Sequence, residues 1–272
     1  MNVGVIIRRV EEDIAEKIAF ASKSLGMKTC QLNCWDKKYF TDEMAEKILK
    51  ACRENDMQIS SFWCGWSGPA VWNFYEGPTT LGIVPEQYRK ERVEELKLGS
   101  DFAKKLGVKN LVTHVGFIPE NPNDPVFGGV VEAVREVAER CLENGQYFLF
   151  ETGQETPVTI LRIIEEVGLD NLGVNLDPAN LIMYGKANPV DALDVFGKYV
   201  RDVHAKDGCY PKDGKSLGPE TAIGDGQVNF PKLVEKLRSV GYDGPLTIER
   251  EISGEQQIKD IIAAKAFLET LF

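Results

Sequence analysis

Residues 147–177 read YFLFETGQETPVTILRIIEEVGLDNLGVNLD, in which two short apolar runs flank a longer amphipathic segment. The runs at 147–151 and 172–177 are typical of buried strands. Between them, apolar residues recur at three- and four-residue spacing over 157–167, which predicts a helix. Gly168 follows that helix and suits the left-handed conformation with which helices commonly end. The stretch therefore predicts a strand–helix–strand unit, the building block of a parallel sheet.

The same alternation extends along the whole chain. We predict eight strands, at Val3–Ile7, Thr29–Asn33, Ile59–Trp63, Asn110–His114, Tyr147–Glu151, Leu172–Asp177, Val200–His204 and Pro245–Glu249. We predict a helix after each strand, at Glu11–Leu25, Asp42–Asn55, Pro85–Leu106, Gly128–Asn144, Pro157–Val167, Pro189–Lys198, Phe230–Val240 and Glu255–Leu271. Eight such units in 272 residues match a closed (β/α)8 TIM barrel. A doubly wound sheet more often has five to seven strands and a phosphate-binding glycine fingerprint after the first, and no such fingerprint is present here. No linker divides the chain, so we expect one domain over residues 1–272.

Composition excludes several classes of protein. The chain has 42 acidic and 32 basic residues and a formal charge of −10, which disfavours a nucleic-acid partner. No apolar run approaches the roughly 20 residues of a membrane span, and the N-terminal segment MNVGVIIRRVEED lacks the features of a signal peptide. The six cysteines form no CxxC pair and lie mostly in apolar segments, as reduced structural thiols do. We therefore expect a cytoplasmic protein without a membrane partner.

Two long connections, Ser67–Val84 and Cys209–Val228, interrupt the regular alternation. Both would lie at the carboxyl ends of the strands, which is the face where such barrels carry their active sites. Loops of this length in a compact barrel usually serve as lids or binding loops.

The last four predicted strands each end at a potential metal ligand. The four residues are Glu151, Asp177, His204 and Glu249. Strand ends converge at one mouth of a barrel, and three carboxylates and an imidazole gathered there would repel one another without a cation. Three oxygen donors and one nitrogen donor favour a single divalent ion. We expect Mn²⁺, and Mg²⁺, Co²⁺ and Zn²⁺ are alternatives. Any single one could be a helix cap or a loop charge, but four consecutive strand ends favour the metal.

Other polar residues lie at or just beyond strand ends and are candidates for substrate contact. They are His114, Glu155, Asn180 and Lys206. Lys206 could polarise a substrate oxygen or form a plain salt bridge, and the sequence leaves both readings open. Trp63 belongs to an aromatic-rich region that could form a wall against the carbon face of a sugar, although core packing explains about half of these aromatic residues equally well.

The segments FLFETG, GVNLDPANL, VRDVHAKDG, IGDGQVNF and LTIERE together resemble the xylose isomerase-like TIM barrels. This superfamily includes sugar-phosphate isomerases and epimerases, ketose 3-epimerases, hydroxypyruvate isomerase and inosose dehydratase. The resemblance spans essentially the whole chain and is poorly specific for the substrate. It implies that Glu151, Asp177, His204 and Glu249 hold a divalent metal and that the two glutamates also act as catalytic acid and base. It also implies a homo-oligomer.

The chain departs from the family pattern at one position. Ketose epimerases commonly have a histidine three residues after the metal-binding aspartate, where this chain has Asn180, which can bind a hydroxyl but cannot shuttle a proton. The DNA-cleaving branch of the superfamily needs several more histidines than the two present here, His114 and His204.

These observations predict a metal-dependent isomerase or epimerase of a sugar or sugar phosphate. A base would remove a proton next to a carbonyl, and an enediolate would form. Two alternatives remain open at this point. One is a dehydratase or lyase that acts on an inosose or keto-sugar through the same site, and the other is a sugar-binding barrel without turnover.

Overall fold

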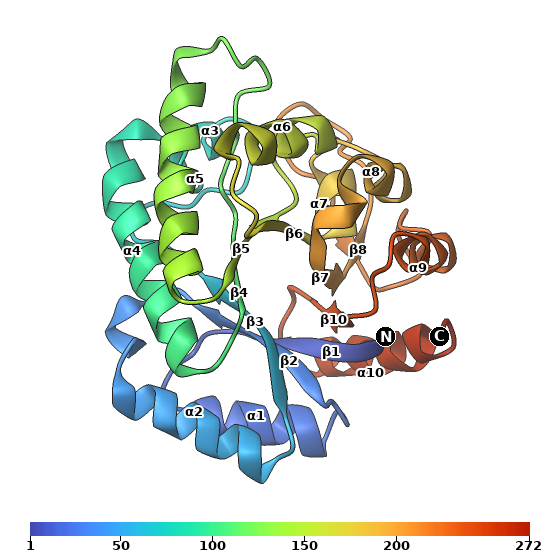
Figure 1. Cartoon of the computed structure of the whole chain (residues 1–272). Coiled ribbons are helices and arrows are strands. Elements are labelled where there is room, and N and C mark those ends of the chain that lie inside the picture. Colours follow the sequence, from blue (N-terminus) through green and yellow to red (C-terminus); the bar gives the residue numbers. More distant parts are fainter.

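The computed structural model describes all 272 residues and shows eight parallel strands closed into a barrel. In barrel order the strands are β1 (Asn2–Ile7), β2 (Thr29–Cys34), β3 (Gln58–Cys64), β4 (Asn110–Thr113), β5 (Tyr147–Glu151), β6 (Leu172–Leu176), β7 (Val200–Ala205) and β10 (Pro245–Ile248). The last strand pairs with the first, with Leu246 opposite Val3, and this pairing closes the barrel. The predicted TIM barrel is confirmed (Figure 1).

Helices surround the barrel (Figure 1). They are α1 (Ile14–Lys23), α2 (Asp42–Glu54), α3 (Gly77–Thr80), α4 (Glu86–Lys105), α5 (Pro125–Glu143), α6 (Pro157–Val167), α7 (Pro178–Met183), α8 (Pro189–Phe196), α9 (Phe230–Ser239) and α10 (Glu255–Glu269). All eight predicted helices are present, with ends shifted by up to three residues. The short helices α3 and α7 and an antiparallel pair, β8 (Asp207–Gly208) with β9 (Glu220–Thr221), were not predicted.

Helix α6 illustrates how local sequence sets these boundaries. The Thr156 side chain accepts a hydrogen bond from the Thr159 amide and caps the amino end, and Pro157 occupies the first turn, where its missing N–H is not needed. Gly168 ends the helix with a φ of 68°, a conformation that costs glycine little. The apolar residues at helical spacing are buried, so that one side of the helix belongs to the apolar core.

The main apolar core contains 68 buried residues contributed by strands and helices. The barrel interior also holds a group of buried polar side chains, namely Gln31, Ser61, Asn175, Asp202 and Thr247. Polar groups in such a place need hydrogen-bond partners, and the Gln31 amide nitrogen lies 2.6 Å from Ser61 Oγ. Gln31 also contacts His204, so this polar interior reaches one of the predicted metal ligands.

The two long loops contact each other. The Phe74 amide donates to the Lys215 carbonyl at 3.1 Å, and Lys215 Nζ lies 5.4 Å from the centre of the Tyr75 ring. Each loop also supplies a side chain to the same cavity, Trp72 from the first and Leu217 from the second. The prediction that both loops lie on one face is therefore confirmed.

A buried arginine holds the first long loop against α4. The Arg92 guanidinium donates to the carbonyls of Ser67, Pro69, Thr80 and Gly82 at 2.6–3.1 Å. Burial lowers its pKa to about 10, so the group remains charged at neutral pH. One side chain thus satisfies four carbonyls that the irregular loop leaves without regular backbone partners.

The carboxylate of Asp207 stabilises the second long loop in a similar way. Its carboxylate accepts hydrogen bonds from the amides of Gly224, Gly226 and Val228 at 2.9–3.2 Å. A Cβ on Gly226 would lie 2.1 Å from Asp207 Oδ1, so the close approach requires glycine. Asp207 therefore supports the loop.

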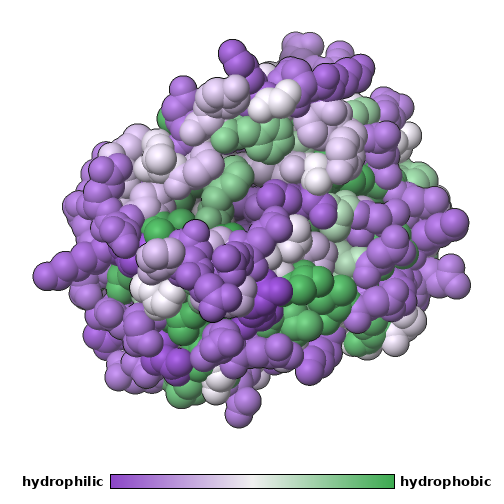
Figure 2. All heavy atoms as spheres, turned by 90° about the horizontal axis from the view of Figure 1, so that it is seen from above, coloured by the Kyte–Doolittle hydropathy of each residue, from purple (hydrophilic) through white to green (hydrophobic).

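Hydrophilic side chains predominate on the face seen from above, and apolar ones form small separate patches (Figure 2). No helix combines the length and apolar character that crossing a bilayer requires. All six cysteines are free thiols, and only Cys209 is not fully buried, which agrees with the structural role predicted for them.

Candidate metal centre

The four strand-end ligands predicted from the sequence lie together. Glu151 ends β5, Asp177 follows β6, His204 belongs to β7 and Glu249 follows β10. One ligand atom from each side chain lies within 4.8 Å of those of the other three. Adjacent parallel strands bring these residues to one end of the barrel, although they lie far apart in sequence.

Imidazole Nδ1 of His204 lies between the three carboxylates. It is 3.3 Å from Glu151 Oε1, 3.5 Å from Glu249 Oε2 and 3.6 Å from Asp177 Oδ2. The other ring nitrogen, Nε2, lies 2.9 Å from the side-chain oxygen of Gln31. The ring is therefore oriented with Nδ1 toward the acidic cluster.

Asp177 is placed to serve both of the roles that the sequence left open. Its Oδ1 caps helix α7 by accepting a hydrogen bond from the Asn180 amide at 2.8 Å. Its Oδ2 and the Nδ1 of His204 are both buried and have no hydrogen-bond partner. Buried polar atoms without partners are costly, and a divalent cation would coordinate both atoms. The residues present therefore fit a divalent metal ion.

Electrostatics favour positive charge at this point of the molecule. Burial alone would lower the pKa of His204, but Glu151, Asp177 and Glu249 outweigh it and raise the pKa well above its ordinary value. Burial would raise the pKa of Glu151, but the charges of His114 and His204 hold it well below its usual range. The cluster thus stabilises a cation, either a proton on the imidazole or a metal ion.

Lys206 lies beside the cluster and is fully buried. Its Nζ is 3.1 Å from Glu249 Oε2, 3.2 Å from Asn180 Oδ1 and 3.5 Å from Asp177 Oδ2. Burial would lower the pKa of Lys206, but Glu249, Glu251 and the other nearby carboxylates raise it well above its ordinary value. The ammonium group is therefore a fixed positive charge with donors directed at the site.

Three further predicted residues surround the Glu151 carboxylate. Asn180 donates through Nδ2 to Oε1 at 3.4 Å, the indole N–H of Trp63 donates to Oε2, and His114 Nε2 lies 3.3 Å from Oε1. Asn180 therefore connects Glu151 with Lys206, because its oxygen accepts from the ammonium group. These contacts fix the orientation of the carboxylate.

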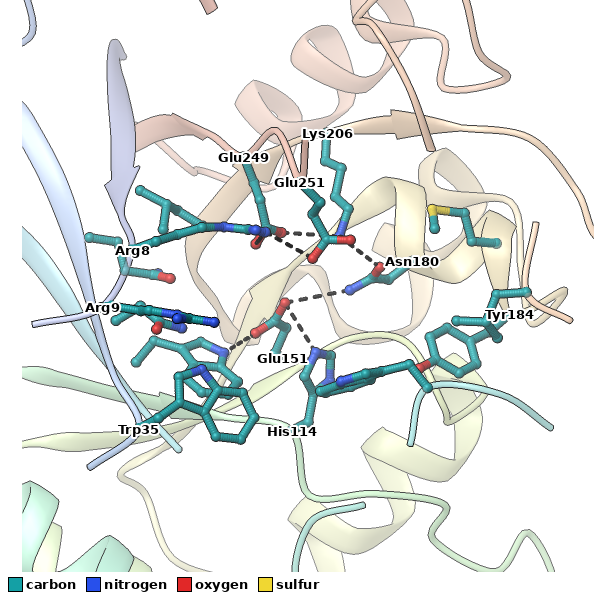
Figure 3. Close-up of a pocket in the computed structure, with 17 residues that line it drawn as sticks. Arg8, Arg9, Trp35, His114, Glu151, Asn180, Tyr184, Lys206, Glu249 and Glu251 are labelled. Carbon is teal, nitrogen blue, oxygen red and sulfur yellow. Dashed lines mark hydrogen bonds and ion pairs between the residues drawn. The ribbon is translucent and has the colours of Figure 1, made fainter. Parts of the chain in front are cut away.

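A cavity of about 410 Å³ adjoins the cluster and is lined by Glu151, Glu249, His114, Asn180, Lys206 and Trp63 among others (Figure 3). Its volume is within the range of small-molecule sites. Trp35, Trp72 and Tyr184 add aromatic surface to its wall. The Trp35 and Trp63 ring centres are 4.9 Å apart, and Trp72 lies 5.1 Å from His114. The cavity thus combines charged groups with an aromatic wall, as sugar recognition requires.

Glu155 does not line this cavity, in contrast to the expectation that it contacts substrate. It lies in the bends between β5 and α6, fully buried, and neither carboxylate oxygen has a hydrogen-bond partner. Burial raises its pKa to about 8. Proximity to a strand end in sequence did not place Glu155 on the wall of the cavity, and its side chain is buried instead.

Sequence reasoning missed several residues of the cavity. Arg8 and Arg9 directly follow β1, and the strand-end criterion applied to the later strands would have found them. Arg8 donates to Glu249 at 3.2 Å and to Glu251 at 3.0 Å. Gln31 carried no such signal, because it is a mid-strand residue whose side chain happens to face the barrel interior.

Comparison with known proteins gives the family. A model described as xylose isomerase-like TIM barrel matches residues 19–271. Protein MJ1311 of Methanocaldococcus jannaschii is 29% identical over 195 residues, which cover 67% of this chain and 63% of that protein. The inosose dehydratase of Geobacillus thermodenitrificans is 25% identical over 194 residues, which cover 60% of this chain and 64% of that enzyme. The chain thus spans less than two thirds of the length of either relative.

Solved structures agree with this result. A xylose isomerase domain protein from Planctomyces limnophilus superimposes with a TM-score of 0.92 at 34% identity, over 99% of this chain and 96% of that chain. The 3-keto-D-glucoside 4-epimerase YcjR from E. coli gives a TM-score of 0.73 at 18% identity, over 99% of both chains, and at that identity the likeness shows the fold alone. The chain therefore belongs to the xylose isomerase-like TIM-barrel family.

Proposed function

We propose that the protein is a divalent-metal-dependent isomerase or epimerase that removes a proton next to the carbonyl group of a sugar. The observation that carries this proposal is the pair of glutamates on either side of His204. Glu151 and Glu249 come from strands separated by β6 and β7, and each has an oxygen within 3.5 Å of the same imidazole nitrogen. Two carboxylates that face one small volume from different strands can reach opposite faces of a planar intermediate.

Glu151, Asp177, His204 and Glu249 would hold the ion, for which Mn²⁺ is our first choice because oxygen donors predominate. When bound, the ion supplies a Lewis acid that makes the C–H group next to the carbonyl more acidic. The protein residues then have defined tasks. One glutamate takes the proton as a carboxylate, and the other, after gaining a proton from solvent, would give one to the opposite face for epimerisation or to the neighbouring carbon for isomerisation.

Both glutamates are held in the carboxylate form, which is the form that can accept a proton. The pKa of Glu249 is held well below its ordinary value, because Lys206, His204 and Arg8 together outweigh the effect of burial. Lys206 lies 3.1 Å from Glu249, so its ammonium group can donate to a substrate oxygen as negative charge develops there. Asn180 can bind a hydroxyl, and Trp63 and Trp72 would cover the carbon face of the sugar and exclude water.

Dehydration of an inosose or keto-sugar is the second candidate. The relatives named inosose dehydratase favour it, and the buried ammonium group of Lys206 could stabilise a departing hydroxyl group by donating a hydrogen bond to its oxygen. The first chemical step is the same proton abstraction. The two reactions differ only in whether the enediolate is reprotonated or loses a β-hydroxyl.

Product analysis tests both candidates. Protein loaded with Mn²⁺ would be incubated with ketoses, keto acids and inososes, and the products identified by proton NMR, with Glu249→Gln as the control. A new epimer or isomer formed only by the wild type supports the first candidate, and loss of a hydroxyl supports the second. Unchanged substrates that still bind the wild type and Glu249→Gln with equal affinity would instead identify a binding protein without turnover.

A further inference from the structure

Arg9 has a backbone conformation that is rare for its residue type. Its φ is 57°, and Asp56 is the only other non-glycine residue with a positive φ. This left-handed conformation costs a residue with a Cβ roughly 1–2 kcal/mol. Neighbouring contacts maintain it, since Lys17 Nζ donates to the Arg9 carbonyl at 2.9 Å and the Val10 amide donates to the Asn33 carbonyl at 2.8 Å. Strained residues that the surrounding structure holds in place cluster at functional sites.

The Arg9 side chain lines the cavity, is exposed to solvent and has no partner within the protein. Its guanidinium makes no hydrogen bond and no ion pair, whereas the adjacent Arg8 is engaged by Glu249 and Glu251. Figure 3 shows Arg9 reaching into the cavity on the side of Trp35, across from Tyr184. The two successive arginines therefore differ in role. Arg8 orders the carboxylates, and Arg9 presents five unused donors to whatever occupies the cavity.

Charge balance indicates what Arg9 would bind. Glu249 and Glu251 pair with Arg8 and Lys206, and Glu151 and Asp177 face His204 and the proposed ion. The positive charge of Arg9 is thus not neutralised by the protein. A neutral sugar would leave the charge of Arg9 unpaired, whereas an anionic substituent on the substrate would pair with its guanidinium group.

We propose that the substrate is a keto-sugar that carries one anionic group, a carboxylate or a phosphate, and that Arg9 binds this group. The inference rests on the proposed function, because it places the carbonyl end of the substrate at the metal cluster. The anionic group would then lie at the end of the substrate remote from the carbonyl. Arg9 would act as a specificity residue that separates acidic sugars from neutral ones.

Equilibrium binding tests this inference without relying on turnover. Calorimetry on Mn²⁺-loaded protein would compare each of the four D-2-ketohexoses with its 6-carboxylate and its 6-phosphate, which differ only at the last carbon. We expect at least one anionic ligand to bind ten times or more tighter than its neutral parent. Arg9→Gln should abolish that gain, and Arg9→Gly, which suits the left-handed backbone, should do the same.

Arg238→Gln is the matched control, because it removes the same charge from an exposed position near the carboxyl end of α9 and should keep the gain. The larger of the two gains identifies the anionic group as carboxylate or phosphate. If neutral ketoses bind in a metal-dependent manner and no anionic ligand binds tighter, or if the gain survives in Arg9→Gln, the inference is wrong and the proposed function stands. If no ligand shows metal-dependent binding, both are wrong.

Discussion

Nε2 of His204 lies 2.9 Å from the side-chain oxygen of Gln31, and this contact determines which ring nitrogen faces the acidic cluster. The Gln31 amide nitrogen donates to Ser61 Oγ and, at 3.3 Å, to Asn175 Oδ1, so that only its oxygen is left for the imidazole. A neutral His204 must then carry its proton on Nε2 and keep the Nδ1 lone pair toward the carboxylates. The buried polar interior of the barrel thus prepares the histidine as a ligand.

Replacement of Gln31 should therefore weaken metal binding without removing a ligand. We expect Gln31→Met, which has a similar volume and no acceptor for Nε2, to lower Mn²⁺ affinity about 10–100-fold. Metal titration followed by calorimetry measures the change. Gln31→Glu keeps an acceptor for the imidazole and should retain more affinity than Gln31→Met. Equal affinity in Gln31→Met and the wild type would show that Gln31 does not orient the ring.

Metal loading should stabilise the folded protein. At a metal concentration one hundred times Kd, binding adds about 2.7 kcal/mol, which raises the melting temperature by roughly 5–10 °C for a chain of this size. Asp177→Asn should abolish this shift, because it replaces the free oxygen by an amide nitrogen while an oxygen remains to cap α7. Thermal unfolding of the wild type and of Asp177→Asn, each with Mn²⁺ and with a chelator, measures the two shifts. A full shift in Asp177→Asn would remove Asp177 from the ligand set.

Glu155 should make stability depend on pH. Its folded-state pKa of about 8 exceeds its ordinary value of 4.5, so the folded state binds the proton more tightly than the unfolded state. The stability contributed by this group is complete below about pH 4.5 and is lost as the pH rises to about 8. Glu155→Gln, which does not titrate, should gain stability relative to wild type across this interval, by at most roughly 1.4 kcal/mol per pH unit. Urea unfolding of both proteins at pH 5, 6.5 and 8 measures the difference in the free energy of unfolding. A difference that does not change with pH would show that the pKa of Glu155 is not raised in the folded protein.

Arg92 should be essential for the first long loop. Arg92→Met leaves four carbonyls without their charged donor, and we expect a loss of about 3 kcal/mol in the free energy of unfolding. Sugar affinity should fall as well, because the loop positions Trp72 at the cavity. Arg135→Met is the control, since Arg135 donates to the Val167 carbonyl outside the cavity and should affect stability alone. Unchanged sugar affinity in Arg92→Met would show that Trp72 does not depend on this contact.

Periodicity and strand-end chemistry predicted much of this molecule. The barrel, its eight major helices and the convergence of Glu151, Asp177, His204 and Glu249 follow from local patterns, because strand ends meet at one mouth regardless of sequence separation. Other features depend on which way a side chain points. The contact between Gln31 and His204 and the burial of Glu155 could not be derived from spacing alone.

The backbone conformation of single residues is a second feature that could not be predicted from the sequence. The sequence around Arg9 does not predict a left-handed backbone conformation, because arginine is not among the residue types that favour this conformation. Contact between the two long loops, at Phe74 and Lys215, likewise depends on tertiary placement of irregular segments. Short-range rules describe neither feature.

The most direct test of the central claim is deuterium exchange from solvent. Wild-type protein and Glu249→Gln, each shown to hold Mn²⁺, would be incubated in D₂O with a keto-sugar that binds the wild type, and deuterium would be followed by proton NMR. We expect the wild type to introduce deuterium at the carbon next to the carbonyl and Glu249→Gln to do so at least 100-fold more slowly. Exchange at equal rates in both proteins, or no exchange by the metal-loaded wild type, would contradict this expectation.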